Sequence, residues 1–81
     1  MIFLIEYDKP KGCIATLKKF EETARSEAET CRLEMELELQ RKKIEHEVVL
    51  LEASDENALR RTHRRYFEDV FQIAKSISYS D

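Results

Sequence analysis

The only glycine and the only proline of this chain stand two residues apart, and no other backbone breaker divides the sequence. Pro10 holds φ at about −65° and Gly12 tolerates positive φ, so their spacing predicts a tight turn. The β-branched and aromatic run 2–7 before the turn indicates a strand, and 13–18 after it indicates a return strand. Segment 2–18 is therefore predicted to be a β-hairpin.

Helix-forming residues dominate the next stretch, from about 22 to 43. Acidic side chains crowd its beginning and Arg41, Lys42 and Lys43 close it, an order that the helix dipole favours. Within it, segment 33–39 alternates Leu or Met with Glu, which is also the signal of a strand. Because none of these residues is β-branched and all are strong helix formers, a helix is favoured.

A continuous Val and Leu run predicts a buried strand over about 46–53. Ser54 is predicted to cap a second helix over about 55–74, and the tail 76–81 is predicted to fray. The chain is thus expected to be one small α+β domain, residues 1–81, in the order β-β-α-β-α. We expect a three-stranded, mainly antiparallel sheet in the order 2-1-3 packed by two helices, because the first strand is the most apolar.

Both faces of this sheet are predicted to be apolar. Two helices on opposite faces would cover both and complete a monomer, whereas two helices on one face would leave a bare surface of the kind that pairs in homodimers. The long helix raises the same question, since a second apolar set lies nearly opposite its main stripe. We predict a homodimer, with a candidate self-association surface at Leu33, Leu37 and Ile44.

A basic cluster lies in the second predicted helix, although the net charge of the chain is −3. It consists of Arg60, Arg61, Arg64 and Arg65. Three interpretations stay open: a solvated face whose heads pair with Glu68 and Asp69, a candidate interaction surface for an acidic protein, or phosphate binding in DNA or RNA. Nucleic-acid binding is the less favoured one, because the adjacent aromatic residues fall on the core stripe of the helix.

No arrangement typical of a catalytic site is present, and we predict no catalytic residue, no cofactor and no metal ligand set. Cys13 and Cys31 do not form a C-x-x-C pair and are predicted to be free thiols, packed as small core residues in a reducing cytoplasm. His46 is expected to be exposed. His63 is expected to be half-buried in a helix, and a small-ligand site at a dimer interface near His63 and Tyr66 is a further alternative. No apolar stretch approaches the ~20 residues that span a bilayer, so no membrane partner is predicted.

The segment from Val48 to His63, with the Tyr-Asp and Pro-x-Gly turn and the long acidic helix, resembles small uncharacterised bacterial α/β proteins of about this length. That resemblance implies no activity. The strand-Leu-Glu-Ala-Ser-helix step is also similar to the last step of dimeric ferredoxin-like domains, although their β-α-β-β-α-β order is not met here. This similarity supports the prediction of a dimer and gives no support to an enzymatic function.

The function predicted from the sequence is a non-enzymatic protein–protein interaction module in the cytoplasm that associates with itself and with an acidic protein. The first alternative is a nucleic-acid-binding accessory protein that uses the arginine cluster. The second is the small-ligand site at a dimer interface.

Overall fold

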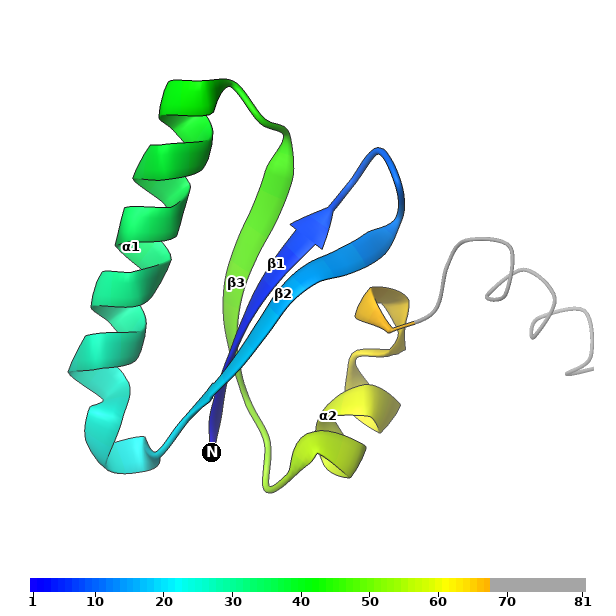
Figure 1. The fold of residues 1–81 in the computed structure, drawn as a ribbon. Coiled ribbons are helices and arrows are strands. Elements are labelled where there is room, and N and C mark those ends of the chain that lie inside the picture. Colours follow the sequence, from blue (N-terminus) through cyan, green and yellow to red (C-terminus); the bar gives the residue numbers. More distant parts are fainter. Residues whose placement is uncertain (68–81) are drawn as a thin grey trace, which may run out of the picture.

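The structure is a computed structural model, and it describes residues 1–67 (Figure 1). The fold class predicted from the sequence is confirmed: three strands form an antiparallel sheet in the order β2-β1-β3, and two helices pack on it. The elements are β1 (Ile2–Asp8), β2 (Cys13–Phe20), the 3-10 turn η1 (Glu22–Ala24), α1 (Arg25–Lys42), β3 (His46–Glu52), α2 (Glu56–Thr62) and the 3-10 turn η2 (Arg64–Tyr66).

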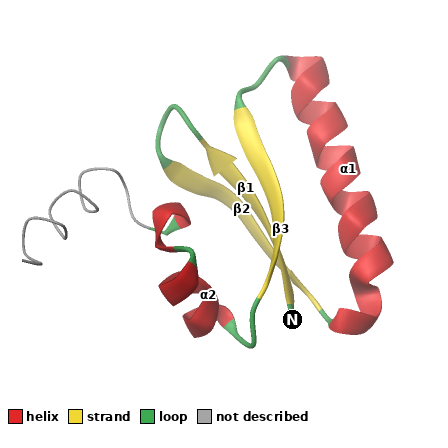
Figure 2. Ribbon diagram, turned by 180° about the vertical axis from the view of Figure 1, so that it is seen from behind, coloured by secondary structure: helices red, strands yellow, loops and turns green. Residues whose placement is uncertain are grey.

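The two helices lie on opposite faces of the sheet, which gives three layers (Figures 1 and 2). Of the two arrangements that the sequence left open, this is the one expected for a monomer, with a helix of the same chain on each sheet face, so the bare sheet face that would favour a homodimer does not occur in residues 1–67. The central strand shows the result, since Ile2, Phe3, Leu4 and Ile5 are at most 1% exposed. A run buried on both faces reads as continuously apolar rather than alternating.

The hairpin turn uses Gly12 as predicted, at φ +68°. The Gly12 amide donates to the Asp8 carbonyl oxygen at 2.7 Å, and the Lys11 amide donates to Oδ1 of Asp8 at 3.1 Å. The register between β1 and β2 shifts between Glu6 and Tyr7, so a bulge lies close to the turn. The turn thereby aligns the two strands antiparallel along their whole length.

The α2 face of the sheet holds the larger core. Phe3, Ile5 and Tyr7 of β1 pack there with Leu59 of α2 and Tyr66 of η2. The Tyr7 and Tyr66 rings meet edge to face, with their centroids 5.3 Å apart. On the other face, Ile2 and Leu4 lie under α1, where the buried Ala28 allows a close approach.

The second helix differs from the prediction of one helix over about 55–74. Asp55, rather than Ser54, is its N-cap and accepts from the Ala58 amide at 2.7 Å. The helix ends at Thr62, because His63 leaves helical geometry at φ −127° and ψ 50°. Thr62 Oγ1 donates to the Ala58 carbonyl oxygen at 2.9 Å, a local bond that competes with helix continuation. The rest of the predicted helix and the tail 76–81 lie outside the described residues.

Helix α1 ends at Lys42, and the residue that follows it lies in the left-handed region. Lys43 has φ 56° and ψ 41°, and its amide donates to the Gln40 carbonyl oxygen at 3.2 Å. The Ile44 amide donates to the Leu39 carbonyl oxygen at 2.9 Å. These two bonds make a Schellman-type end, which turns the chain back toward β3.

Candidate interaction surfaces

Three large apolar side chains stand exposed along α1 and the turn that follows it, and we call them the α1 ridge. They are Leu33, Leu37 and Ile44, exposed by 53%, 56% and 40%. Residues four apart on a helix share a face, whereas the sheet side of α1 carries the buried Ala28. The ridge therefore lies away from the buried contact at Ala28, on the side of α1 next to β3, and its side chains stay partly open to solvent among residues 1–67.

A hollow of about 540 Å³ runs between α1 and β3, and all three ridge residues line it. His46 and Val48 form its wall on the β3 side. Because β3 is the last strand of the sheet, the hollow lies beside a strand whose outer side has no partner among the described residues. Exposed apolar surface and an unpaired strand thus occur together on this side of the domain.

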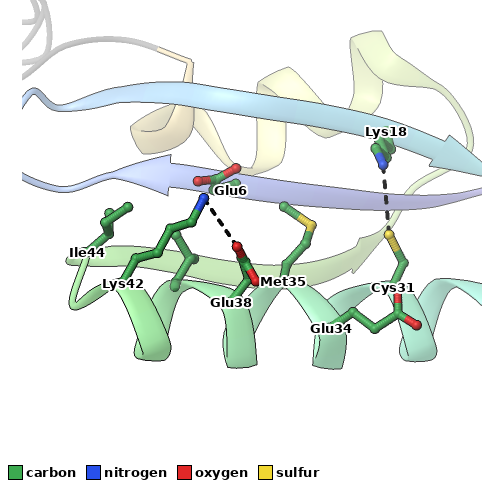
Figure 3. A pocket seen from close by; sticks show the side chains of 9 residues that line it. Glu6, Lys18, Cys31, Glu34, Met35, Glu38, Lys42 and Ile44 are labelled. Atoms are coloured by element: carbon green, nitrogen blue, oxygen red, sulfur yellow. Dashed lines mark hydrogen bonds and ion pairs between the residues drawn. The ribbon is translucent and has the colours of Figure 1, made fainter.

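A second hollow, of about 400 Å³, lies on the other side of α1 (Figure 3). Its charges are mixed: Lys42 pairs with Glu38 at 3.2 Å, and Lys18 Nζ lies 3.9 Å from Cys31 Sγ. Hydrogen bonds from Arg41, and then from Lys42, hold the pKa of Glu38 below its ordinary value. Neighbouring cations thus neutralise the carboxylate of Glu38. Elsewhere in residues 1–67, too, no group of His, Cys, Asp and Glu is placed to hold a metal ion.

His46 is half-buried, which corrects the expectation that it is exposed. Its Nδ1 lies 2.5 Å from Glu6 Oε2 and its Nε2 lies 3.4 Å from Asp8 Oδ2, and the imidazole is only 17% exposed. Thr16 donates to the other Glu6 oxygen at 2.8 Å. We call these four residues the His46 cluster. It joins all three strands, so its role in the described structure is to hold the polar end of the sheet together.

The His46 cluster was not predicted from the sequence, although a signal was present. In the predicted antiparallel order 2-1-3, β1 lies between the other two strands. The register then sets Asp8 opposite His46 and Glu6 opposite Thr16. A polar residue at the end of each strand was the clue, and polar side chains in adjacent strands satisfy one another.

The two cysteines also differ from expectation. Cys13 is exposed and Cys31 is only partly buried, so neither is a core residue, and both are free thiols. Cys13 lies at the start of β2 directly after the turn. Its position on an edge strand beside the hairpin turn explains why its side chain meets solvent.

The arginine cluster does not form one continuous helix face, because α2 ends between its two halves. Arg60 lies over the Phe67 ring, 4.6 Å from the centroid, and pairs with Glu56 at 3.8 Å. Arg61 is exposed and makes no ion pair with any residue in 1–67. The anticipated pairing with Glu68 and Asp69 falls outside the described residues.

The contacts that Arg65 makes in residues 1–67 are with side chains of the same domain. Its guanidinium lies 4.3 Å from the Tyr66 ring centroid, donates to the Tyr66 hydroxyl at 2.6 Å and bonds to Glu47 at 3.2 Å. The hydrogen bond with the Tyr66 hydroxyl is the main cause that raises the pKa of Arg65. Tyr66 itself is only 6% exposed. The hydroxyl and ring of Tyr66 therefore serve the core, which leaves little at this position to form a ligand site.

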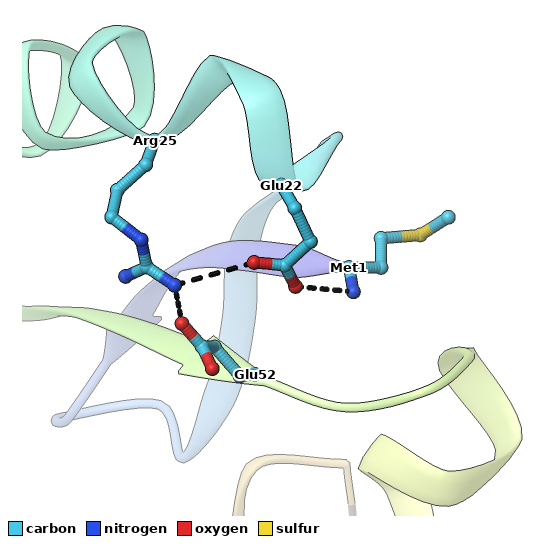
Figure 4. A network of polar contacts seen from close by, with 4 residues as sticks. All are labelled: Met1, Glu22, Arg25 and Glu52. Atoms are coloured by element: carbon cyan, nitrogen blue, oxygen red, sulfur yellow. Dashed lines mark hydrogen bonds and ion pairs between the residues drawn. The ribbon is translucent and has the colours of Figure 1, made fainter.

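The N-terminal end of α1 is tied to one end of the sheet, where the start of β1 lies beside the end of β3 (Figure 4). The Met1 ammonium group lies 2.8 Å from Glu22 Oε1, Arg25 lies 3.3 Å from Glu22 Oε2, and Arg25 also pairs with Glu52. The hydrogen bond from the Met1 ammonium group is the largest cause that lowers the pKa of Glu22. This network sets the first turn of α1 level with the last residue of β3.

Comparisons with protein-family models, with curated proteins and with solved structures found no match for this chain. The resemblance to small bacterial α/β proteins therefore stays a prediction. Among the described helices, none combines the length and the apolar character that crossing a bilayer requires.

Proposed function

We propose that this chain is a non-enzymatic protein–protein interaction module and that its first partner is a second copy of itself. The observation that carries the proposal is the α1 ridge. Within residues 1–67, the exposed large apolar side chains are Leu33, Leu37 and Ile44, and all three lie along one hollow. Scattered exposed leucines need no explanation, but a clustered apolar surface beside a hollow is typical of an interface.

The test is sedimentation velocity of the full chain over a series of concentrations, beside a Leu33→Ser/Leu37→Ser variant. We expect a wild-type dimer in the micromolar range. The double variant should raise the dissociation constant at least tenfold, because it removes apolar area from the interface of both copies.

A Glu27→Gln/Glu34→Gln variant is the matched control, because both carboxylates lie on α1 beside a different, shallow hollow with Ser26 and Cys31. It should associate like the wild type. A wild-type protein that sediments as a monomer up to millimolar concentration would refute self-association.

An acidic protein is the second partner that we propose, and Arg61 is the observation that supports it. An exposed guanidinium without an ion pair in residues 1–67 is available to a carboxylate of another molecule. Arg61→Glu is therefore a sharper variant than any change at Arg65, whose removal would also break its bonds to Glu47 and Tyr66. Capture of an acidic partner should fall in Arg61→Glu, and unchanged capture would refute this role.

Nucleic-acid binding remains the alternative function, with less support. A stacking platform needs exposed aromatic rings, whereas Tyr66 is buried and Phe67 is covered on one side by Arg60. Titration of labelled RNA and DNA at two salt concentrations decides between nucleic-acid binding and protein binding. Binding that falls steeply with salt and weakens in Arg61→Glu would favour phosphate contacts, because these release counterions.

A further inference from the structure

The two edges of the sheet are protected to very different degrees. The β2 edge carries Lys18 and Lys19 and is bent by the bulge opposite Glu6 and Tyr7, and both devices discourage pairing with another strand. The β3 edge has no bulge in its register with β1, and its middle is Val48-Val49-Leu50-Leu51. An edge of this kind is a template for a further strand.

The register shows which backbone groups of β3 face outward. The Ala53 amide donates to the Met1 carbonyl oxygen at 3.1 Å, one step beyond the pair of Ile2 and Glu52. Hydrogen-bonded and non-bonded pairs alternate along an antiparallel ladder. Residues 47, 49 and 51 therefore bond to β1, and the amides and carbonyls of Val48, Leu50 and Glu52 point to the open edge, whereas the His46 amide donates to the Ile44 carbonyl oxygen at 3.1 Å.

The middle of the α1 ridge and the middle of the open β3 edge lie at the same level along the strand. Arg25, at the start of α1, pairs with Glu52 at the end of β3, and only residues 43–45 separate the end of α1 from His46. The helix thus runs antiparallel to β3, and its middle lies level with Val49. A two-fold axis through Val49, perpendicular to the sheet, sets two β3 strands antiparallel. It also places Leu33 of one α1 at the level of Leu37 of the other.

Charges toward the ends of the paired elements agree with this axis. In strands paired about Val49, Val48 faces Leu50 of the second copy, and His46 faces Glu52. In antiparallel helices with Leu33 opposite Leu37, Glu29 comes level with Arg41 of the second copy. In α1, Glu27 and Glu29 stand with Arg25 and Arg32 in the first half, Glu34, Glu36 and Glu38 lie in the middle, and Arg41 and Lys42 form a basic end. Antiparallel packing therefore brings the basic end beside Glu29, while Glu34 and Glu36 of the two copies come level at the centre.

We propose that β3 pairs with β3 of a second copy about a two-fold axis at Val49, which joins two three-stranded sheets into one continuous sheet under two antiparallel α1 helices. The inference rests on the proposed self-association and adds its geometry. A symmetric pairing of this kind closes on itself. It satisfies the outward amides of Val48 and Leu50, whose apolar side chains make the same edge prone to uncontrolled association when it is open.

The test uses proline on the two edges of the full-length chain. Val48→Pro removes an outward amide that has no bond within the described monomer, and proline is tolerated on an edge strand where the amide faces solvent. Lys19→Pro is the matched control, because the same alternation directs the Lys19 amide outward from β2. Circular dichroism and thermal unfolding at low concentration establish that both variants remain folded.

We expect Val48→Pro to raise the dimer dissociation constant roughly thirty-fold, as the loss of two symmetry-related backbone hydrogen bonds predicts, while Lys19→Pro changes it less than two-fold. Hydrogen exchange of single amides gives an independent readout in the wild type. The amides of Val48 and Leu50 should be protected where the protein is dimeric and exchange rapidly on dilution, whereas those of Val49 and Leu51 should be protected in both states.

A dimer that is weakened by Leu33→Ser/Leu37→Ser but not by Val48→Pro would overturn the strand pairing and leave self-association standing. Exchange at Val48 and Leu50 that does not depend on concentration would overturn it as well. A wild-type monomer at all concentrations would instead overturn the self-association on which the inference rests.

Discussion

The two faces of the sheet are covered by helices in opposite ways. On the α2 face, a short helix and a 3-10 turn deliver Leu59 and Tyr66 into an aromatic cluster with Phe3 and Tyr7. On the α1 face, a long helix lies on the sheet through Ala28, with open hollows on both sides. The comparison teaches that the length of a helix does not measure how much it contributes to a core. Helix α1 gives one fully buried residue, Ala28, and two exposed large apolar ones, Leu33 and Leu37.

The largest contrast is expected from one substitution made in both helices. Leu59→Ala empties a site that is 0% exposed and should lower the free energy of unfolding by about 3 kcal/mol. Leu37→Ala, on the ridge, should change the stability of the monomer by less than about 0.5 kcal/mol and instead weaken association. Urea unfolding at low protein concentration measures both. Equal losses in the two variants would show that the faces do not differ in this way.

The next largest effect is expected from a substitution that tests how closely α1 approaches the sheet. Ala28→Leu adds volume where α1 rests on Ile2 and Leu4, and overpacking there should lower the free energy of unfolding by about 2 kcal/mol. Thr30→Leu, exposed on the same helix, is the control and should be close to neutral or slightly stabilising. Thermal unfolding by circular dichroism is sufficient to separate them. A neutral Ala28→Leu would mean that the contact is loose enough to absorb a larger side chain.

A smaller effect is expected at the polar end of the α1 face. Glu6→Gln replaces the carboxylate that contacts both His46 and Thr16, and should lower the free energy of unfolding by about 1–2 kcal/mol. Glu45→Gln, an exposed neighbour of His46, provides the comparison and should have no measurable effect. If Glu6→Gln also leaves the free energy of unfolding unchanged, the contact with Asp8 alone is enough to hold the imidazole of His46.

The smallest effect is a pH dependence of the free energy of unfolding, which arises from carboxylates in α1 and in the 3-10 turn before it. Hydrogen bonds from the Met1 ammonium group and from Arg41 lower the pKa of Glu22 and Glu38 below the ordinary 4.5. Their stabilisation is present above about pH 4.5 and is lost as the pH falls through the lower, folded-state pKa. The free energy of unfolding should therefore decrease between about pH 5 and pH 3, and less steeply in Glu22→Gln/Glu38→Gln. An unchanged slope in that variant would assign the acid sensitivity to other carboxylates.

The order of the elements was predictable because the local signals agreed. Pro10 and Gly12 marked the hairpin, and the apolar run of β1 placed that strand at the centre of the sheet. The alternation of Leu and Glu in α1 did not mislead, because residues with strong helix propensity outweighed a strand-like period. The exposure of Leu33 and Leu37 followed from the same pattern, since both were left over once one face of α1 was assigned to the sheet.

The end of the second helix at Thr62 was not predictable from the pattern. Leu59 and Tyr66 stand at helical spacing, and both are in the core, so the periodicity was informative about burial and wrong about conformation. Contacts distant in sequence decide the geometry, because Tyr66 packs on the Tyr7 ring and Arg65 reaches Glu47 in β3. The arginine cluster depended on that helix, and it is divided where the helix ends.

The position of β1 also governs how the chain folds. The first strand in sequence is the middle strand of the sheet, so the hairpin with β2 is a local, rapidly formed unit. The second neighbour of β1 is β3, which lies some forty residues further along the chain. The Leu59 and Tyr66 side chains that cover β1 come later still. A nascent chain therefore carries an assembled hairpin with uncovered apolar faces until β3 and α2 have left the ribosome. The late docking of β3 and α2 onto the hairpin is therefore expected to be the slow step of folding, because it brings together residues far apart in the sequence.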